Sequence, residues 1–298
     1  MKPILRLEHI VKNYEAKKAV DDVSFEMPEA SIFGLLGPNG AGKTSLIRII
    51  TTITRADSGR VFLEGEPISE LSGSKIGYMP EERGLYKKMK VGEHLMYLAQ
   101  LKGMTAAAAR HELSHWFTKF DIKDWWNKTI EELSKGMQQK VQFIATIVHR
   151  PKLLILDEPF SGLDPLNATL IQDEIDELHR NGTSIIFSTH RMEQVEEICD
   201  RIVLINQGKN VLEGAVADIK NQFKENIFNL TFEGQLPAAA LENIEIVAQK
   251  DNSITLRLDE RHTANSALQQ FIGAGVPIRS FHEVLPSLNE IFIRQVRG

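Results

Sequence analysis

The sequence predicts an α/β fold built on a mixed β-sheet with a helical insert, followed by a small α+β domain. A glycine-rich loop follows an apolar strand and opens a helix. Short apolar strands alternate with helices between about residues 150 and 206. After residue 218 a separate pattern of strands and helices begins. We therefore predict a first domain at 1–218, with the helical insert at about 91–148, and a second domain at 219–298.

Composition limits the classes of protein to which the chain can belong. It has 298 residues, 42% hydrophobic and 25% charged, as in ordinary globular proteins. The net charge of −5 provides no broad basic field, so no nucleic acid is expected as a partner. Cys199 is the only cysteine, which excludes an intrachain disulfide and favours a reducing compartment. Apolar runs are too short for a signal peptide or a membrane span, so a membrane role would need a partner.

The elements of the first domain follow from hydrophobic pattern and turn residues. Its first part has short strands at 4–7, 23–27, 31–36 and 61–63, with a helix over 43–53. Leucines and aromatic residues then recur at spacings of three and four in the insert, which is typical of helices. Beyond the insert, strands at 153–156, 184–188 and 202–205 alternate with helices at 171–178 and 193–198, as in a largely parallel sheet.

The second domain has its own pattern. Alternating residues predict strands at 227–232 and 254–258, and a further strand follows a glycine turn at 276–281. A helix is predicted over 263–272, and a closing helix starts near residue 286, with Leu288, Ile291 and Phe292 facing inward. This layout predicts a small α+β domain.

The glycine-rich loop matches G-x-x-x-x-G-K-T between a strand and a helix. Its residues are Gly37, Pro38, Asn39, Gly40, Ala41, Gly42, Lys43 and Thr44. In such a loop, backbone N–H groups and a helix N-terminus surround phosphate oxygens. We expect Lys43 to reach the β- and γ-phosphates of ATP, Thr44 to offer its hydroxyl to Mg²⁺, and Ser45 to lie near the α-phosphate.

Polar residues follow two of the later apolar strands. Asp157 ends the strand at 153–156 and is expected to hold Mg²⁺ through its water shell. Glu158 comes next, where it can orient and polarise an attacking water. His190 follows the strand at 184–188 and is expected to sense the γ-phosphate through a hydrogen bond.

Taken in order, these motifs resemble the ATP-binding subunit of an ABC transporter over about residues 1–218. The resemblance also includes Tyr14 at an adenine-stacking position, Glu81, the segment 133–137 and the turn 161–164. It implies a P-loop NTPase of ABC type that dimerises head to tail. Ser134 and Gly136 would then contact the ATP of the partner subunit, and Asp164 would couple the two sites.

The chain departs from the family pattern in two places. Lys135 and Met137 interrupt the usual Leu-Ser-Gly-Gly-Gln signature, and Lys135 either faces the partner's nucleotide or is a solvated surface charge. Glu81 stands where the family usually has glutamine. It either ligates Mg²⁺ with more negative charge than glutamine would bring, or belongs to an acidic surface loop.

These observations lead to an expected function. The chain is expected to be an ATPase that forms a homodimer or heterodimer of ATP-binding subunits and acts with a membrane permease on a separate chain. The tail ending PSLNEIFIRQVRG resembles the C-terminal extension of drug- and sodium-export systems, so export is the expected direction. The resemblance implies a cytoplasmic location at the inner face of the cell membrane. The alternative is a soluble ABC-type ATPase acting on DNA or the ribosome, although such relatives usually have long coiled coils or two ATPase units.

Overall fold

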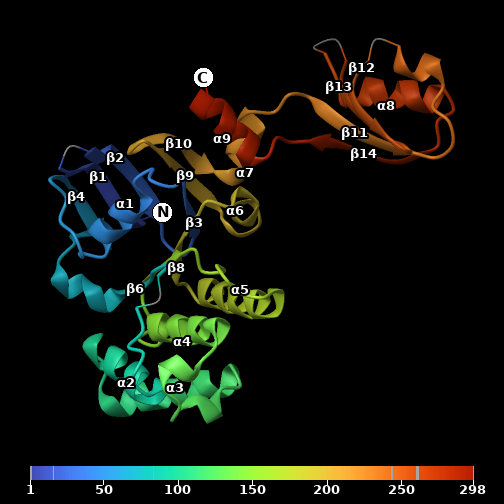
Figure 1. Ribbon diagram of the computed structural model, residues 1–298. Helices are drawn as coiled ribbons and strands as arrows, with labels where there is room; N and C mark the ends of the chain where they lie inside the picture. Colours follow the sequence, from blue (N-terminus) through green and yellow to red (C-terminus); the bar gives the residue numbers. More distant parts are fainter. Residues whose placement is uncertain (1, 16, 83, 243, 260–261, 298) are drawn as a thin grey trace. The chain divides into compact units, whose positions relative to one another are not determined.

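The chain forms two compact units, Met1–Ala215 and Val216–Gly298. The computed structural model describes residues 2–15, 17–82, 84–242, 244–259 and 262–297 (Figure 1). The division falls at Ala215 and not at residue 218, because helix α7 (Val216–Gln222) already belongs to the second unit.

An antiparallel sheet carries the first part of the chain. Its strands lie in the order β2-β1-β4-β5 and comprise β1 (Pro3–Tyr14), β2 (Lys17–Pro28), β4 (Ser58–Leu63) and β5 (Glu66–Pro67). The first two strands are much longer than predicted. Their pairing runs from Pro3↔Pro28 to Tyr14↔Lys17, so the hairpin includes polar residues beyond its buried part.

A six-stranded sheet positions the strand ends from which the predicted site residues extend. Its order is β10-β9-β3-β8-β7-β6, with β3 (Ile32–Leu36), β6 (Ile76–Met79), β7 (Leu153–Asp157), β8 (Ser184–Thr189), β9 (Arg201–Asn206) and β10 (Lys209–Ala215). All neighbouring pairs are parallel except β9 with β10. Because parallel strands end at a common edge, the segments after Leu36, Asp157 and Thr189 meet there.

Helix α1 (Lys43–Ile50) joins the two sheets into one core. Leu46 and Ile47 are fully buried in a cluster that includes residues of both sheets. The predicted extension of this helix to residue 53 is wrong. The hydroxyl of Thr51 donates to the Ile47 carbonyl, 2.8 Å away, and Thr52 has a left-handed backbone with φ 61°, which ends the helix.

The helical insert contains three α-helices, α2 (Val91–Leu101), α3 (Ala106–Lys119) and α4 (Lys135–Ile147). Helix α4 packs against β6 and α2, which connects the insert to the six-stranded sheet. Helices α5 (Pro165–Arg180) and α6 (Met192–Ile198) follow β7 and β8 along the chain. In the described part of the chain, helices fall short of the length and apolar character that crossing a bilayer requires.

The second unit is an α+β domain around a four-stranded antiparallel sheet. The order is β12-β13-β11-β14, with β11 (Ile227–Phe232), β12 (Glu245–Lys250), β13 (Ser253–Arg257) and β14 (Ile278–Val284). Its helices include α8 (Ala264–Gly273) and α9 (Leu288–Arg297). Leu230, Ile254 and Phe271 are fully buried in a core made from this unit alone.

Candidate nucleotide-binding site

The backbone of the glycine-rich loop requires glycine at two positions. Gly37 has φ 147°, and a Cβ there would lie 2.1 Å from the carbonyl oxygen of Ile205. Gly42 has φ 113°, and its Cβ would lie 2.4 Å from the carbonyl oxygen of Ala19. Both contacts involve backbone atoms that cannot rotate away, so the loop path depends on the missing side chains.

A cavity of about 270 Å³ lies beside the loop and contains most of the predicted site. It is lined by Tyr14, Lys17, Ala19, Asn39, Gly40, Ala41, Gly42, Lys43, Thr44, Ser45, Glu81, Asp157 and Glu158. Gly37 lies outside this lining, and Pro38 borders a neighbouring cavity of about 180 Å³. A larger cavity of about 720 Å³, beside β6 and the insert, is lined by none of the predicted site residues.

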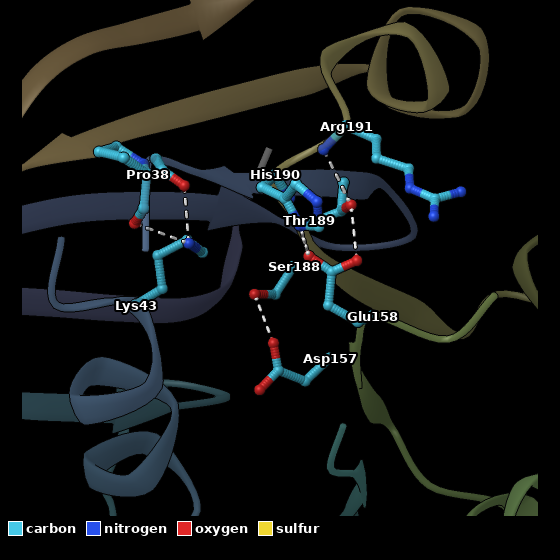
Figure 2. A network of polar contacts seen from close by, with 9 residues as sticks. Pro38, Lys43, Asp157, Glu158, Ser188, Thr189, His190 and Arg191 are labelled. Atoms are coloured by element: carbon cyan, nitrogen blue, oxygen red, sulfur yellow. Dashed lines mark hydrogen bonds and ion pairs between the residues drawn. The ribbon is translucent and has the colours of Figure 1, made fainter. Parts of the chain in front are cut away.

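Lys43 presents a buried cation to the loop. Its ammonium donates to the carbonyl oxygens of Gly37 and Pro38, at 2.7 Å and 3.2 Å (Figure 2). Burial lowers the pKa of Lys43, whereas the nearby carboxylates of Asp157 and Glu158 oppose that shift. A bound polyphosphate would add negative charge beside Lys43, and this charge would stabilise the buried ammonium.

Asp157 is a buried carboxylate at the end of β7. It accepts a 2.8 Å hydrogen bond from the hydroxyl of Ser188 on the adjacent strand β8. Burial raises the pKa of Asp157, the Ser188 bond works against that increase, and the charge of Glu158 adds to it. A cation placed at this carboxylate would relieve the unfavourable burial of its charge.

Glu158 turns out of β7 with a left-handed backbone, φ 50°. One carboxylate oxygen accepts from the Thr189 hydroxyl at 3.0 Å, and the other lies near the backbone N–H and Nδ1 of His190, at 2.9 Å and 2.6 Å (Figure 2). Glu158 and His190 thus form one polar cluster, in which Glu158 lines the cavity and His190 is not among its lining residues.

Tyr14 and Glu81 approach the cavity from separate elements. Tyr14 ends β1 and is 41% exposed, with the Lys12 ammonium 5.6 Å from its ring centroid. Glu81 follows β6 and is exposed. Lys17 lines the same cavity, although no motif in the sequence marks it.

Ser134, Gly136 and Asp164 lie outside the cavity that contains Lys43. Ser134 begins α4, where its hydroxyl accepts from the Met137 N–H at 3.3 Å. Asp164 begins α5 and accepts from the Asn167 N–H at 3.0 Å. Both are exposed helix caps at the surface.

The oxygen donors in the cavity fit a magnesium–polyphosphate group. Thr44, Glu81 and Asp157 provide the hydroxyl and carboxylate oxygens that Mg²⁺ prefers. Within the described residues, no group of three or more histidine, cysteine, aspartate or glutamate side chains is arranged to hold a metal. The carboxylates of Glu81 and Asp157 suit Mg²⁺, which is usually held by one or two carboxylates together with water and substrate phosphates.

Comparisons with known proteins identify the family of the chain. The family described as ABC transporter matches residues 20–161, and the family described as ATP-binding protein DrrA1-3-like, C-terminal domain, matches residues 214–296. The chain is 42% identical over 296 residues to the uncharacterized ABC transporter ATP-binding protein YhaQ of Bacillus subtilis (strain 168), a match that covers 98% of each. It is 30% identical over 302 residues to the linearmycin resistance ATP-binding protein LnrL of the same organism, covering 97% of each.

Solved structures lead to the same family. A structure of an ATP-binding subunit of an ABC transporter aligns with a TM-score of 0.69 and 29% identity, over 74% of this chain and 93% of that one. The predicted resemblance, the P-loop fold of ABC type and the export-type C-terminal extension are therefore confirmed. The chain belongs to the ATP-binding proteins of ABC transporters, with a C-terminal domain of the DrrA1-3-like kind.

Proposed function

We propose that this protein hydrolyses ATP as a dimer and powers export through a separate membrane-spanning subunit. The observation that carries the proposal is the convergence of Lys43, Asp157 and Glu158 on one cavity beside the glycine-rich loop. A buried cation, a metal-binding carboxylate and a potential general base are the groups that phosphoryl transfer to water requires.

Each residue that the sequence predicts to act on this chain's own ATP has a proposed role. The loop N–H groups of Gly37 to Gly42 and the ammonium of Lys43 bind the phosphates, and Ser45 contacts the α-phosphate. Tyr14 stacks on the adenine. Thr44, Asp157 and Glu81 hold Mg²⁺, which neutralises charge on the phosphates. Glu158 orients the attacking water and accepts its proton, and His190 holds Glu158 and senses the γ-phosphate.

The exposed caps Ser134 and Asp164 support a dimeric site. Ser134 and Gly136 open helix α4 at the surface, outside the cavity of their own chain. A serine hydroxyl and backbone N–H groups at a helix start form an anion site. We propose that this site contacts the γ-phosphate bound to a partner subunit, and that Asp164 couples the two nucleotides.

Two observations support a membrane partner and export. The relative LnrL is named for resistance to linearmycin, and the C-terminal domain is of the DrrA1-3-like kind. Resistance to a compound is compatible with its removal from the cell. We therefore propose a location at the inner face of the cell membrane, beside a permease on another chain.

The proposal is tested by Glu158→Gln. The amide cannot accept the proton of the attacking water, so we expect ATP hydrolysis to fall about 10²–10⁴-fold while ATP still binds. A dimer should then accumulate with ATP in analytical ultracentrifugation. Glu197→Gln, at an exposed position of α6, is the matched control and should hydrolyse ATP normally. Wild-type protein that hydrolyses ATP fully as a monomer would exclude the shared site.

The partner is tested by affinity purification from detergent-solubilised membranes. We expect an integral membrane protein to co-purify and to stimulate the ATPase activity. Recovery of ribosomes or DNA that stimulate the activity would instead favour a soluble ABC-type ATPase, the alternative function.

A further inference from the structure

Helix α4 makes two buried side-chain hydrogen bonds to the ends of neighbouring strands. Gln139 donates through Nε2 to the carbonyl oxygen of Pro159 at 3.0 Å. Gln142 donates through Nε2 to the carbonyl oxygen of Pro80 at 2.8 Å. The two glutamines are three residues apart and therefore share one face of the helix. We call this pair the glutamine clamp.

Each acceptor of the glutamine clamp adjoins a carboxylate of the nucleotide cavity. Pro80 immediately precedes Glu81, and Pro159 immediately follows Glu158. The proline ring fixes φ near −65°, which removes one of the two backbone rotations that could move each carbonyl group. Strands β6 and β7, which end just before these segments, pair directly with each other. The glutamine clamp thus holds two adjacent strand ends at once.

The same helix begins at the proposed contact with the partner's nucleotide. Ser134 caps α4, and Gly136 lies in its first turn. One helical turn later Gln139 bonds the Pro159 carbonyl, and Gln142 follows after almost another turn. A hydrogen-bonded helix is stiff over this distance, so a displacement of either strand end is transmitted to Ser134.

The amide groups of Gln139 and Gln142 are buried, where an apolar side chain would pack at a lower cost in free energy. Gln139 is 2% exposed and Gln142 4% exposed, on a face that also buries Phe143 and Thr146. The Oε1 atom of Gln142 has no hydrogen-bond partner among the described residues. A buried unpaired acceptor costs about 1–3 kcal/mol, which offsets the single bond that Gln142 donates. An apolar side chain of similar length would avoid that cost, so we attribute the amide to positioning.

We propose that Gln139 and Gln142 are positioning residues. They fix the N-terminus of α4, with Ser134 and Gly136, in position relative to the carboxylates of the same chain's cavity. These carboxylates are Glu81 and Glu158. The inference rests on the proposed shared site, in which α4 serves one nucleotide and the strand ends serve the other. Rearrangement of Glu81 or Glu158 on binding ATP would thereby reach the surface offered to the partner subunit.

The test replaces each glutamine by methionine, which has similar length but no donor. Neither glutamine lines the nucleotide cavity, so the Kd of a fluorescent ATP analogue should stay within about threefold for Gln139→Met and Gln142→Met. We expect kcat to fall about tenfold with KM nearly unchanged, because the loss affects the assembled site. In the Glu158→Gln background, dimerisation on ATP should weaken about tenfold. Gln172→Met is the control, because that amide bonds Asp176 within its own helix.

Hydrogen exchange of the nucleotide-free protein tests the glutamine clamp without relying on catalysis. Gln142→Met should speed exchange in residues 76–90, and Gln139→Met in residues 157–164, with no change for Gln172→Met. Unchanged exchange in both segments, or a lowered Tm with normal kcat and normal dimerisation, would overturn the inference. If the wild-type protein neither hydrolyses ATP nor dimerises, the proposed function fails, and the exchange comparison still decides the role of the glutamine clamp.

Discussion

Asp157 and Lys43 line the same cavity and carry opposite charges, and burial disfavours the charged form of each. Burial raises the pKa of Asp157 and lowers the pKa of Lys43. In the structure neither group bonds the other: Asp157 accepts from Ser188, and Lys43 donates to carbonyl oxygens of the loop. The cavity therefore carries an electrostatic cost in the empty protein, and a magnesium–phosphate ligand would offset it.

Replacing Asp157 by asparagine should stabilise the empty protein. The neutral amide removes a buried charge and can still accept from Ser188, so we expect Tm to rise by about 2–4 °C at pH 7. The folded-state pKa of Asp157 lies above its ordinary value of 3.8, so ionisation in the folded state costs stability. The gain should be full above that pKa and vanish as the pH falls below 3.8.

Calorimetry at several pH values measures this effect. Magnesium-dependent ATP binding should weaken in the same variant, because a metal-binding oxygen is lost. A lower Tm at pH 7 would show that the carboxylate stabilises the empty fold, contrary to this account.

Sequence motifs marked most of the residues that line the cavity beside the glycine-rich loop, but not the hydrogen bonds between the side chains there. Spacing alone marked Gly37–Thr44, because a phosphate loop is formed by consecutive residues. Lys17 could not be found in this way, because the turn after β1 brings it to the cavity. The bonds of Thr189 and His190 to Glu158 join segments that are distant in sequence, and only the pairing of β7 with β8 reveals them.

At the level of elements, a side-chain cluster joins α3 to α5. Lys119 at the end of α3 contacts Glu174 at 2.7 Å and Glu177 at 2.9 Å. Burial favours a lower pKa for Lys119, but the two carboxylates outweigh it and raise the value. Burial also raises the pKa of Glu174, against the opposing effect of Lys119. The cluster connects the insert to the helix that begins at Asp164.

Lys119→Met should destabilise the protein by about 1–3 kcal/mol, because Glu174 would remain buried without its cation. Urea denaturation measures the change. Adding Glu174→Gln should recover part of the lost free energy, since it removes the unpaired charge. If the double variant is no more stable than Lys119→Met, the loss comes from packing around the lysine stem.

The sequence pattern was most reliable for long or strongly apolar elements. The apolar strand β7 lies close to its predicted position, and helices α2 and α4 lie within the region predicted to be helical, about 91–148. Strand β6 was missed because it is only four residues long and contains Gly77, which strand propensities disfavour. A Cβ at Gly77 would lie 2.5 Å from the Thr146 carbonyl oxygen, so close packing with α4 explains that glycine.

In the whole molecule, every residue that lines the nucleotide cavity belongs to the first unit. The second unit has its own sheet and its own buried cluster. A unit with a complete core can fold without its neighbour. We therefore expect the first unit to bind nucleotide without the DrrA1-3-like domain.

A protein ending at Ala215 should fold and bind ATP with a Kd within about threefold of the full chain. Fluorescence titration with an ATP analogue checks the affinity, and a cooperative thermal transition checks folding. Loss of binding in a cooperatively folded truncated protein would mean that the second unit contributes to the nucleotide site.

Gly37 also has a consequence for how this gene can vary. Any single-base change that converts a glycine codon to another amino acid adds a Cβ. At Gly37 that atom would lie 2.1 Å from the backbone oxygen of Ile205, in a conformation with φ 147° that other residues rarely adopt. We therefore expect every amino-acid change that a single base can cause at Gly37 to disrupt the loop. As a result, the contact between the loop and the end of β9 should be retained in descendants of this gene.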